Sequence, residues 1–409
     1  MPLPDIKVEV GFDLTNTPGA PFFTLDNDEK GRLDNIEYGL GGAAFFDVTD
    51  RAVAVSIERG KEPIVFGYPA AEISVELNNH DRTFDPEYPD SPFARSIVPG
   101  IEVRVSANDR RLFVGIIEDW DLTYRPNGDS RAFIKGLDAI ALLNRQSISP
   151  HTPTEQSTGE RINAILDRPE IGWPADLRDI DDGTVTIAAN PIEEFRPALT
   201  YLQNIASSDP GDFYIDREGK ATFRDRRKAP TSGDLITFGE GGVPFDSLAV
   251  SYGQEQLFNE INVVRQGGGT VVASDLNSIN SYGVRSLDIN NIQVASDVEA
   301  ADIAVGLASL YSEPEYRFRE LEVYLHKDAL TPSEVNSLLE FDLGSIGEVV
   351  FTPNGVGSPI QRYVEVIGVD HQIEVDSHVV VFGFKETRYA PLVLDDAEFG
   401  KLDVGTLSW

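Results

Sequence analysis

The chain has 409 residues, of which 41% are hydrophobic and 9% aromatic, so we expect two or three domains rather than one core. It contains no cysteine, which excludes a disulfide framework, thiolate metal ligands and a cysteine nucleophile. Its 34 basic and 68 acidic residues give a formal charge of −34. This charge argues against nucleic-acid binding, because phosphate binding needs clustered cations.

The first 50 residues are irregular and acidic. Ile6, Val8 and Val10 alternate as they would in a strand, so residues 1–50 are expected to form an N-terminal arm or an extra strand pair beside the first domain. The N-terminus lacks both a basic segment and an apolar segment, which predicts no signal peptide. No run reaches the 18 or more apolar residues that a membrane span requires, so we expect none.

Residues 51–146 have the pattern of an antiparallel β unit. Hairpin turns are expected at Asn108-Asp109 and Asn127-Gly128. The strands and a short helix are predicted at 52–59, 71–77, 101–107, 112–124, 131–135 and, for the helix, 137–144. This order favours a first five-stranded barrel closed by the helix.

A proline-rich loop over residues 78–99 interrupts this unit. Connections longer than about 12 to 15 residues without their own secondary structure are usually functional arms or disordered, and the aromatic residues of this loop can be buried. We interpret the loop as an arm that reaches onto a neighbouring subunit. Its candidate contact residues are Asn78, Asn79, Phe84, Tyr88, Phe93 and Pro99.

Residues 147–240 have an α+β pattern and are expected to form an inserted subdomain. Ser157 and Glu160 have capping-box spacing, Pro197 suits the first turn of a second helix, and Glu218-Gly219 predicts a hairpin. The basic run over residues 224–228 is most simply a solvated strand edge.

Residues 241–390 predict a second β unit, followed by a tail over residues 391–409. Two further capping boxes, Ser296 with Glu299 and Thr331 with Glu334, predict helices. Strands are expected at 318–325, 349–352, 363–369 and 379–384. The order of strand, helix and terminal hairpin resembles that of residues 51–146, which suggests two copies of one barrel.

The sequence carries no recognisable catalytic, cofactor or metal site. Gly39-x-Gly41 lacks the strand-to-helix context of a dinucleotide fingerprint. The Asp26-x-Asp28 segment resembles a calcium loop, but Lys30 stands where a ligand oxygen belongs. The histidines show no metal-ligand spacing, and His371 and His378 are not expected to share a strand face. We therefore expect no enzyme and no cofactor.

Several motifs together carry a family resemblance. The segments L-N-N-x-D-R-x-F-D-P and S-P-F…P-G-I-E-V-R-V, over residues 77–105, are followed in order by R-L-F-V-G-I-I-E-D-W and G-L-D-A-I-A-L-L-N. Further motifs lie at residues 212–226, 258–263, 366–373 and 394–403. Their colinear order resembles the minor tail proteins of long-tailed phages of actinobacteria, in the tail-tip or baseplate-hub family.

The resemblance implies a mainly β fold with two tail-tube-like antiparallel barrels and short helices, separated by the inserted α+β subdomain. It implies a homotrimeric hub at the tail tip of the virion, which closes the tail tube, joins the sixfold tube to threefold tip proteins and opens for DNA ejection. The implied partners are the distal tail protein ring, the C-terminus of the tape-measure protein and other minor tail or receptor-binding proteins. Genomic DNA would pass without specific binding. The net negative charge then has two explanations: it keeps the protein soluble, or it gives the bore of the tube an acidic wall to which DNA does not adhere.

Three alternatives remain open. The first is the hexameric distal tail protein, although a second barrel favours the hub. The second is a cell-wall or polysaccharide hydrolase in the inserted subdomain. The third is a carbohydrate-binding module that uses Trp120, Trp173 or Trp409, although Trp120 alternates with strand residues and is expected in the core.

Overall fold

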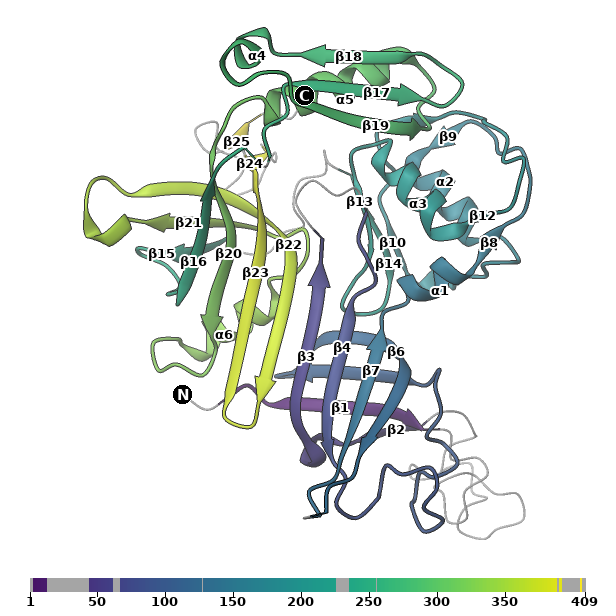
Figure 1. Cartoon of the computed structure of the whole chain (residues 1–409), viewed down its shortest axis with the longest axis vertical. Helices are drawn as coiled ribbons and strands as arrows, with labels where there is room; N and C mark the ends of the chain where they lie inside the picture. Colours follow the sequence, from purple (N-terminus) through teal and green to yellow (C-terminus); the bar gives the residue numbers. More distant parts are fainter. Residues whose placement is uncertain are drawn as a thin grey trace.

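The computed structural model describes residues 3–12, 44–61, 67–126, 128–225, 235–254, 256–387, 390–391 and 405–406. Figure 1 shows four parts: a lower β unit, a second β unit beside it, a subdomain with α1, α2 and α3, and a layer at the top. The glycine motif, the calcium-like segment, Asn127, Trp409 and residues 226–228 of the basic run lie outside the described residues.

The lower unit follows the alternation of its sequence. Val8, Val10, Val55, Val75 and Ile134 point inward and are at most 3% exposed. Its elements are β1 (Ile6–Phe12), β2 (Ala44–Asp47), η1 (Thr49–Arg51), β3 (Ala52–Gly60), β4 (Glu72–Asn78), β5 (Glu102–Ala107), β6 (Arg110–Thr123) and β7 (Arg131–Leu137). The predicted turn at Asn108-Asp109 is confirmed, and both residues have positive φ.

Strand β6 is long enough to belong to two layers. Its first half pairs with β5, and its second half, from Ile116 onward, pairs with β7, with a bulge between Ile117 and Asp119. The strands β1 and β5 therefore cross behind β3, β4 and β7 (Figure 1). The described strands do not close into a barrel, because the edge of β3 that closure would need is paired with β22 instead. The prediction of a closed barrel over residues 51–146 is therefore wrong.

The second β unit is built in the same way around another long strand. Strand β22 pairs with β21 over its first half and, beyond a bulge between Val366 and Gly368, with β3. Its elements are β15 (Ile236–Gly239), β16 (Ser247–Tyr252), β20 (Tyr316–Tyr324), α6 (Pro332–Glu340), β21 (Ile346–Phe351), η3 (Pro353–Gly355), β22 (Ile360–Glu374) and β23 (Ser377–Thr387). This unit does not close into a separate barrel within the described residues either.

The two units are joined into one sheet. Its order is β16-β20-β23-β22-β3-β4-β7-β6-β5-β1-β2, so the β22–β3 pairing is the link between the units. We call this pairing, from Gly368 opposite Gly60 to Glu374 opposite Ala54, the joint. Glycines at one end let the strands approach: a Cβ on Gly60 would lie 2.7 Å from the Cα of Gly368, which also faces Gly383.

The inserted subdomain packs two helices on small sheets. The capping box of Ser157 and Glu160 opens α2, as predicted, and the hairpin that turns at Glu218 and Gly219 is also confirmed. Helix α1 packs against α3 and β12 and does not close the lower unit, which corrects that expectation. The elements are α1 (Ile140–Arg145), β8 (Ser147–Ile148), β9 (Gln156–Ser157), α2 (Thr158–Leu166), η2 (Ala175–Leu177), β10 (Arg178–Ile180), β11 (Thr186–Ile187), β12 (Arg196–Pro197), α3 (Ala198–Ser207), β13 (Asp212–Ile215) and β14 (Ala221–Arg224).

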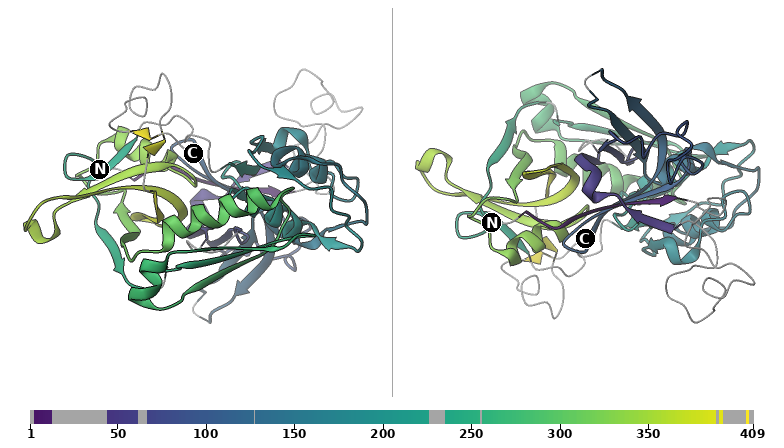
Figure 2. Two further views of the ribbon diagram at one scale, coloured as in Figure 1. Left: turned by 90° about the horizontal axis from the view of Figure 1, so that it is seen from above. Right: turned by 90° about the horizontal axis from the view of Figure 1, so that it is seen from below.

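The top layer is a three-stranded sheet covered by one helix, and the sequence pattern did not indicate it as a separate unit. Helix α5 begins with the predicted capping box of Ser296 and Glu299. The elements are β17 (Glu260–Arg265), β18 (Thr270–Ser274), α4 (Leu276–Tyr282), β19 (Ser286–Ile292) and α5 (Asp297–Tyr311). Seen from above, this layer lies in front of the main sheet, and the inserted subdomain lies to one side (Figure 2). Two short strands, β24 (Ala390–Pro391) and β25 (Gly405–Thr406), pair near the C-terminus.

The close approach at the joint predicts that Gly60→Ala destabilises the chain. The added methyl would lie 2.7 Å from the Cα of Gly368 and 2.9 Å from the carbonyl oxygen of Ile367, so the backbone must shift. We expect the free energy of unfolding in urea to fall by about 1–3 kcal/mol. The control is Gly253→Ala, where no atom lies within 4 Å of the new methyl. Equal effects of both substitutions would contradict tight packing at the joint.

Candidate functional site: an acidic sheet face

One face of the main sheet is acidic on both sides of the joint. The opposite face is buried, and alternation then turns every second residue of β22, β3 and β4 outward. The carboxylates on this open face, which we call the acidic face, are Glu58, Glu72, Glu76, Glu118, Asp119, Asp121, Glu320, Glu322, Asp370 and Glu374.

Several of these carboxylates stand directly opposite one another. Asp370 pairs with Glu58 across the joint, and Glu58 pairs in turn with Glu72 on β4. Like charges in directly opposite positions of an antiparallel pair destabilise a sheet. The row therefore opposes folding rather than supporting it, and the stability of the sheet does not explain these residue types.

The cations on β7 offset only part of this charge. Lys135 Nζ lies 2.7 Å from Asp121 Oδ2. Arg131 lies 3.4 Å from Glu76 and 3.0 Å from Asp129. These pairs are partly exposed and contribute little stability each, and they leave Glu58 and Glu72 without a partner from β7.

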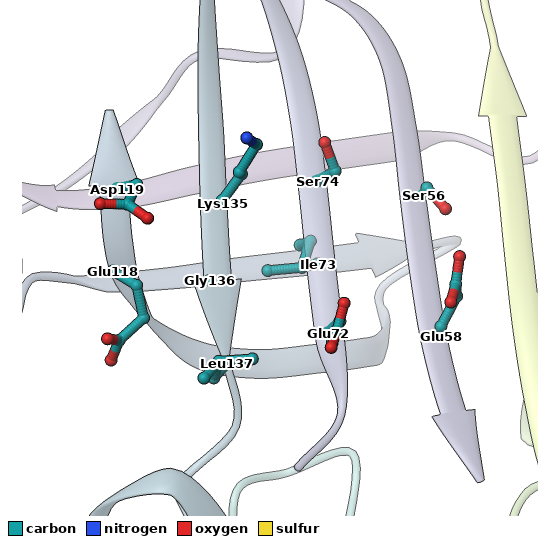
Figure 3. A pocket seen from close by; sticks show the side chains of 10 residues that line it. All are labelled: Ser56, Glu58, Glu72, Ile73, Ser74, Glu118, Asp119, Lys135, Gly136 and Leu137. Atoms are coloured by element: carbon teal, nitrogen blue, oxygen red, sulfur yellow. The ribbon is translucent and has the colours of Figure 1, made fainter. Parts of the chain in front are cut away.

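A shallow hollow of about 400 Å³ lies on this face where β3, β4, β7 and β6 run side by side. Figure 3 shows its side chains in two rows, one with Ser56, Ser74, Lys135 and Asp119 and one with Glu58, Glu72, Leu137 and Glu118. The bulge in β6 places Glu118 beside Asp119. The hollow is open, and its lining combines two serine hydroxyls and four carboxylates with the cation Lys135 and the apolar side chains of Ile73 and Leu137.

The pKa of Asp370 is shifted by burial and by the repulsion within the row. Burial, together with the neighbouring charges of Glu58 and Glu320, raises this pKa to about 6. The backbone N–H of Arg59 donates to Asp370 Oδ1 at 3.3 Å and acts in the opposite direction. Near pH 6 the joint therefore carries a carboxyl group that is only partly ionised.

A buried network of charges lies near the glycine end of the joint, where β3 leaves the sheet. Arg59 Nη1 lies 2.6 Å from Asp342 Oδ1 of the second unit. Lys61 pairs with Asp212 of the inserted subdomain, which lies 3.6 Å from Lys385. Although burial raises the pKa of Asp212, Lys61 and Lys385 hold it below its ordinary value. Each pair joins different parts of the chain, so the network fixes how the parts are arranged.

The proline-rich loop folds back onto its own subunit over much of its length. Asn79 and Phe84 are 0% and 1% exposed, and the Phe84 N–H donates to Asn79 Oδ1 at 2.9 Å. The ring of Phe93 stacks 4.1 Å from that of Phe12 on β1. Asn78 is half-buried in β4 opposite Arg131.

Two of the candidate arm residues remain accessible. Pro99 is exposed, and Tyr88 is half-buried beneath the guanidinium of Arg82, 4.8 Å from its ring centre. Trp120 is half-buried and stacks on Phe84 with ring centres 6.4 Å apart. The indole N–H of the buried Trp173 donates to the Leu177 carbonyl at 2.8 Å. Both indole rings thus pack within the chain and do not form an exposed surface on which a sugar ring could stack.

The expectation that His371 and His378 do not share a face is wrong. Their ring nitrogens Nδ1 and Nε2 lie 3.0 Å apart inside the core. The β22–β23 hairpin places Ile373 opposite His378 and His371 opposite Val380, which makes the two histidines diagonal neighbours. A register signal was present in the sequence, because Asp376 marks a tight turn midway between the flanking strand patterns.

Two kinds of feature are absent from the described part of the chain. It contains no group of three or more histidine, aspartate or glutamate side chains arranged to hold a metal ion. None of the helices among the described residues is both long and apolar enough to cross a bilayer.

Comparison with solved structures gives the class of the fold, a tail-protein fold. No protein-family model and no curated protein matches the chain. The tail protein from Neisseria meningitidis MC58 is similar, with a TM-score of 0.58 and 12% identity over 94% of this chain and 97% of that one. The 43 kDa tail protein of prophage MuSo2 from Shewanella oneidensis has a TM-score of 0.57 and 13% identity over 93% and 96%. At these identities the shared feature is the fold, and it extends over nearly the whole of each chain.

The electrostatics of the acidic face predict that Asp370→Asn stabilises the chain at neutral pH. A folded-state pKa of about 6 lies above that of an unfolded aspartate, so ionisation of Asp370 opposes folding as the pH rises through this range. We expect a gain of about 1–3 kcal/mol in urea unfolding at pH 7.5 that disappears below about pH 4. Glu374→Gln, on the same face and strand but exposed, is the control. A gain that does not depend on pH would contradict this explanation.

Proposed function

We propose that this chain is a structural protein of a phage tail tip, a homotrimeric hub that closes the distal end of the tail tube. The observation that carries the proposal is the acidic face, which continues across the joint despite the cost of opposing like charges. The likeness of nearly the whole chain to two tail proteins supports it, and so do the colinear motifs that resemble actinobacterial phage tail-tip proteins.

In this proposal the acidic face lines the bore. DNA leaving through a tube must pass without adhering to its wall. Carboxylates repel phosphates within about 8 Å at physiological salt, so only charges on the wall itself act on the DNA. Glu58, Glu72 and Asp370 lie in one row that would face the axis.

The free edges of the sheet support closure into a ring. The outer edge of β16 has no strand partner among the described residues, and the backbone hydrogen bonds between the β5 side and β6 end at Ile117, so the rest of β6 also has an edge without a strand partner among the described residues. These edges lie at opposite ends of the stretch that carries the acidic face. Head-to-tail contacts between unlike edges close rings when the rotation per subunit allows it. Two similar β units in each of three copies would present six faces to a sixfold tube.

The partners and arms follow from the same proposal. The distal tail protein ring would sit above the hub, the tape-measure C-terminus would end in the bore, and other minor tail or receptor-binding proteins would attach outside. The accessible parts of the loop over residues 78–99, with Tyr88 and Pro99, would contact the neighbouring subunit. Asn79, Phe84 and Phe93 instead give the loop its shape. The hub would open for DNA ejection.

A cross-linking experiment tests the ring. The chain has no native cysteine, so Ala249→Cys on β16 and Asp121→Cys on β6 can be combined in one protein. Oxidation of the tip assembled with its tail partners should give covalent species up to three copies, which mass measurement identifies. Either substitution alone should give no such series. A chain that stays monomeric in the presence of tail proteins would overturn the proposal.

The bore assignment predicts how charge reversal acts. Glu58→Lys, Glu72→Lys and Glu374→Lys together should make the assembled tip retain double-stranded DNA at about 50 mM salt and release it at about 200 mM, because phosphate binding is salt-dependent. The matched control carries Glu155→Lys, Glu193→Lys and Glu194→Lys in exposed positions of the inserted subdomain. Gel-shift and DNA-release assays measure the effect. Equal DNA retention by both triple variants would place the acidic face away from the DNA path.

A further inference from the structure

The buried imidazoles of His371 and His378 form a pair that the proposed function does not use. They are 3% and 0% exposed, and their ring centres lie 5.3 Å apart. The contact between Nδ1 of His371 and Nε2 of His378, at 3.0 Å, requires one nitrogen to carry a proton and the other to offer a lone pair. Nδ1 of His378 has no hydrogen-bond partner among the described residues.

This geometry fixes how many protons the pair can hold. In the neutral pair each ring carries one proton, and the contact is a hydrogen bond. One additional proton places a charge in the core, and a second removes the lone pair, so two N–H groups would face each other at 3.0 Å. The folded pair therefore resists protonation.

The charges around the pair increase that resistance. Arg59 on β3 and Arg217 in the β13–β14 turn act on His371, and both are cations. Beyond His378, its backbone N–H donates to Nδ1 of His326, which follows β20, at 3.4 Å. Of the three carboxylates of β22, Asp370 and Glu374 project from the opposite face of the strand, and Glu365 pairs with Lys385 at 2.8 Å. Within the described residues, no carboxylate forms an ion pair with either ring.

One member of the pair, His371, lies in the joint, and its partner His378 lies on the neighbouring strand β23. His371 lies opposite Ile57 in the β22–β3 pairing, the link between the two β units of the main sheet. We propose that His371 and His378 form an acid-sensitive latch: the neutral pair holds the joint closed, and protonation favours a state in which β22 and β23 separate from β3. The latch is a property of the single chain and does not depend on the proposed function.

The pKa directions agree with this mechanism. Burial is the main cause that lowers the pKa of His378, to about 3, and that of His371, well below its ordinary value; Arg59 and Arg217 also lower the pKa of His371. A histidine with a depressed folded-state pKa contributes stability that is complete above about pH 6.5 and decreases as the pH falls below it. At pH 5 the opening equilibrium should rise by about 30-fold for each histidine that becomes exposed.

Asp370 acts in the opposite direction over part of this range. Its pKa of about 6 means that its protonation stabilises the joint as the pH falls. The latch is therefore tested in an Asp370→Asn background, which removes that contribution. The introduced carboxamide would keep an oxygen acceptor for the Arg59 N–H.

The test measures hydrogen exchange in the full chain at pH 7.5 and pH 5, corrected for the intrinsic pH dependence of exchange. Amides of β3, β22 and β23 should open at least about 10-fold more at pH 5, whereas those of β1 and β5 should not. The double variant His371→Leu/His378→Leu replaces both rings by apolar groups and should lose this pH dependence. The same dependence in the double variant would overturn the latch.

A second measurement does not require any variant to fold. The ring-carbon NMR signals of the five histidines can be followed from pH 8 to pH 5 in the unmodified chain. We expect those of His371 and His378 to stay at neutral-imidazole positions in the folded state while the exposed His80 serves as the internal reference. Titration of either signal near pH 6.5 without loss of structure would equally overturn the latch.

Discussion

The arrangement of the molecule depends on the pairing of β22 with β3. Through this joint, two β units from distant parts of the sequence share one hydrogen-bonded ladder. The pairing uses the edge of β3 that would otherwise close the lower unit on itself, so continuity between the units and closure of each are mutually exclusive. Glycines at 60, 368 and 383 permit the close approach, and the charge network of Arg59, Lys61 and Asp212 holds the surrounding parts in position.

The two faces of the joint have opposite character. On the buried face, the apolar side chains of both units form one core with His371 and His378 inside it. On the open face, Asp370 and Glu58 oppose each other with the same charge. The apolar burial is what stabilises the ladder, and it offsets the repulsion on the other side. A protein that needed only a stable sheet would place neutral or paired residues there, so the charge is not explained by the stability of the sheet.

Local features of the fold were predictable from the sequence, and long-range pairings were not. The capping boxes at Ser157, Ser296 and Thr331 each begin a helix, because caps depend on residues three positions apart. The Asn108-Asp109 turn follows from the same kind of local rule. The joint could not be found this way, because an alternating pattern in β3 does not reveal which distant strand will use its edge. The prediction of two closed barrels failed at this point.

In the acidic face and in the loop over residues 78–99, too, the sequence indicates the local composition but not the long-range arrangement. Composition alone shows that the chain is acidic, but the carboxylates that share a row come from β3, β4 and β22, whose register only the fold reveals. The sequence favoured contacts of the loop's aromatic residues with a neighbouring subunit, whereas Phe84 and Phe93 pack largely within their own subunit, against Phe12 and Trp120. An electron cryomicroscopy map of the assembled tail tip tests the central claim most directly. The account predicts three copies around the axis with Glu58, Glu72 and Asp370 facing the bore, and a map with these residues on the outer wall would contradict it.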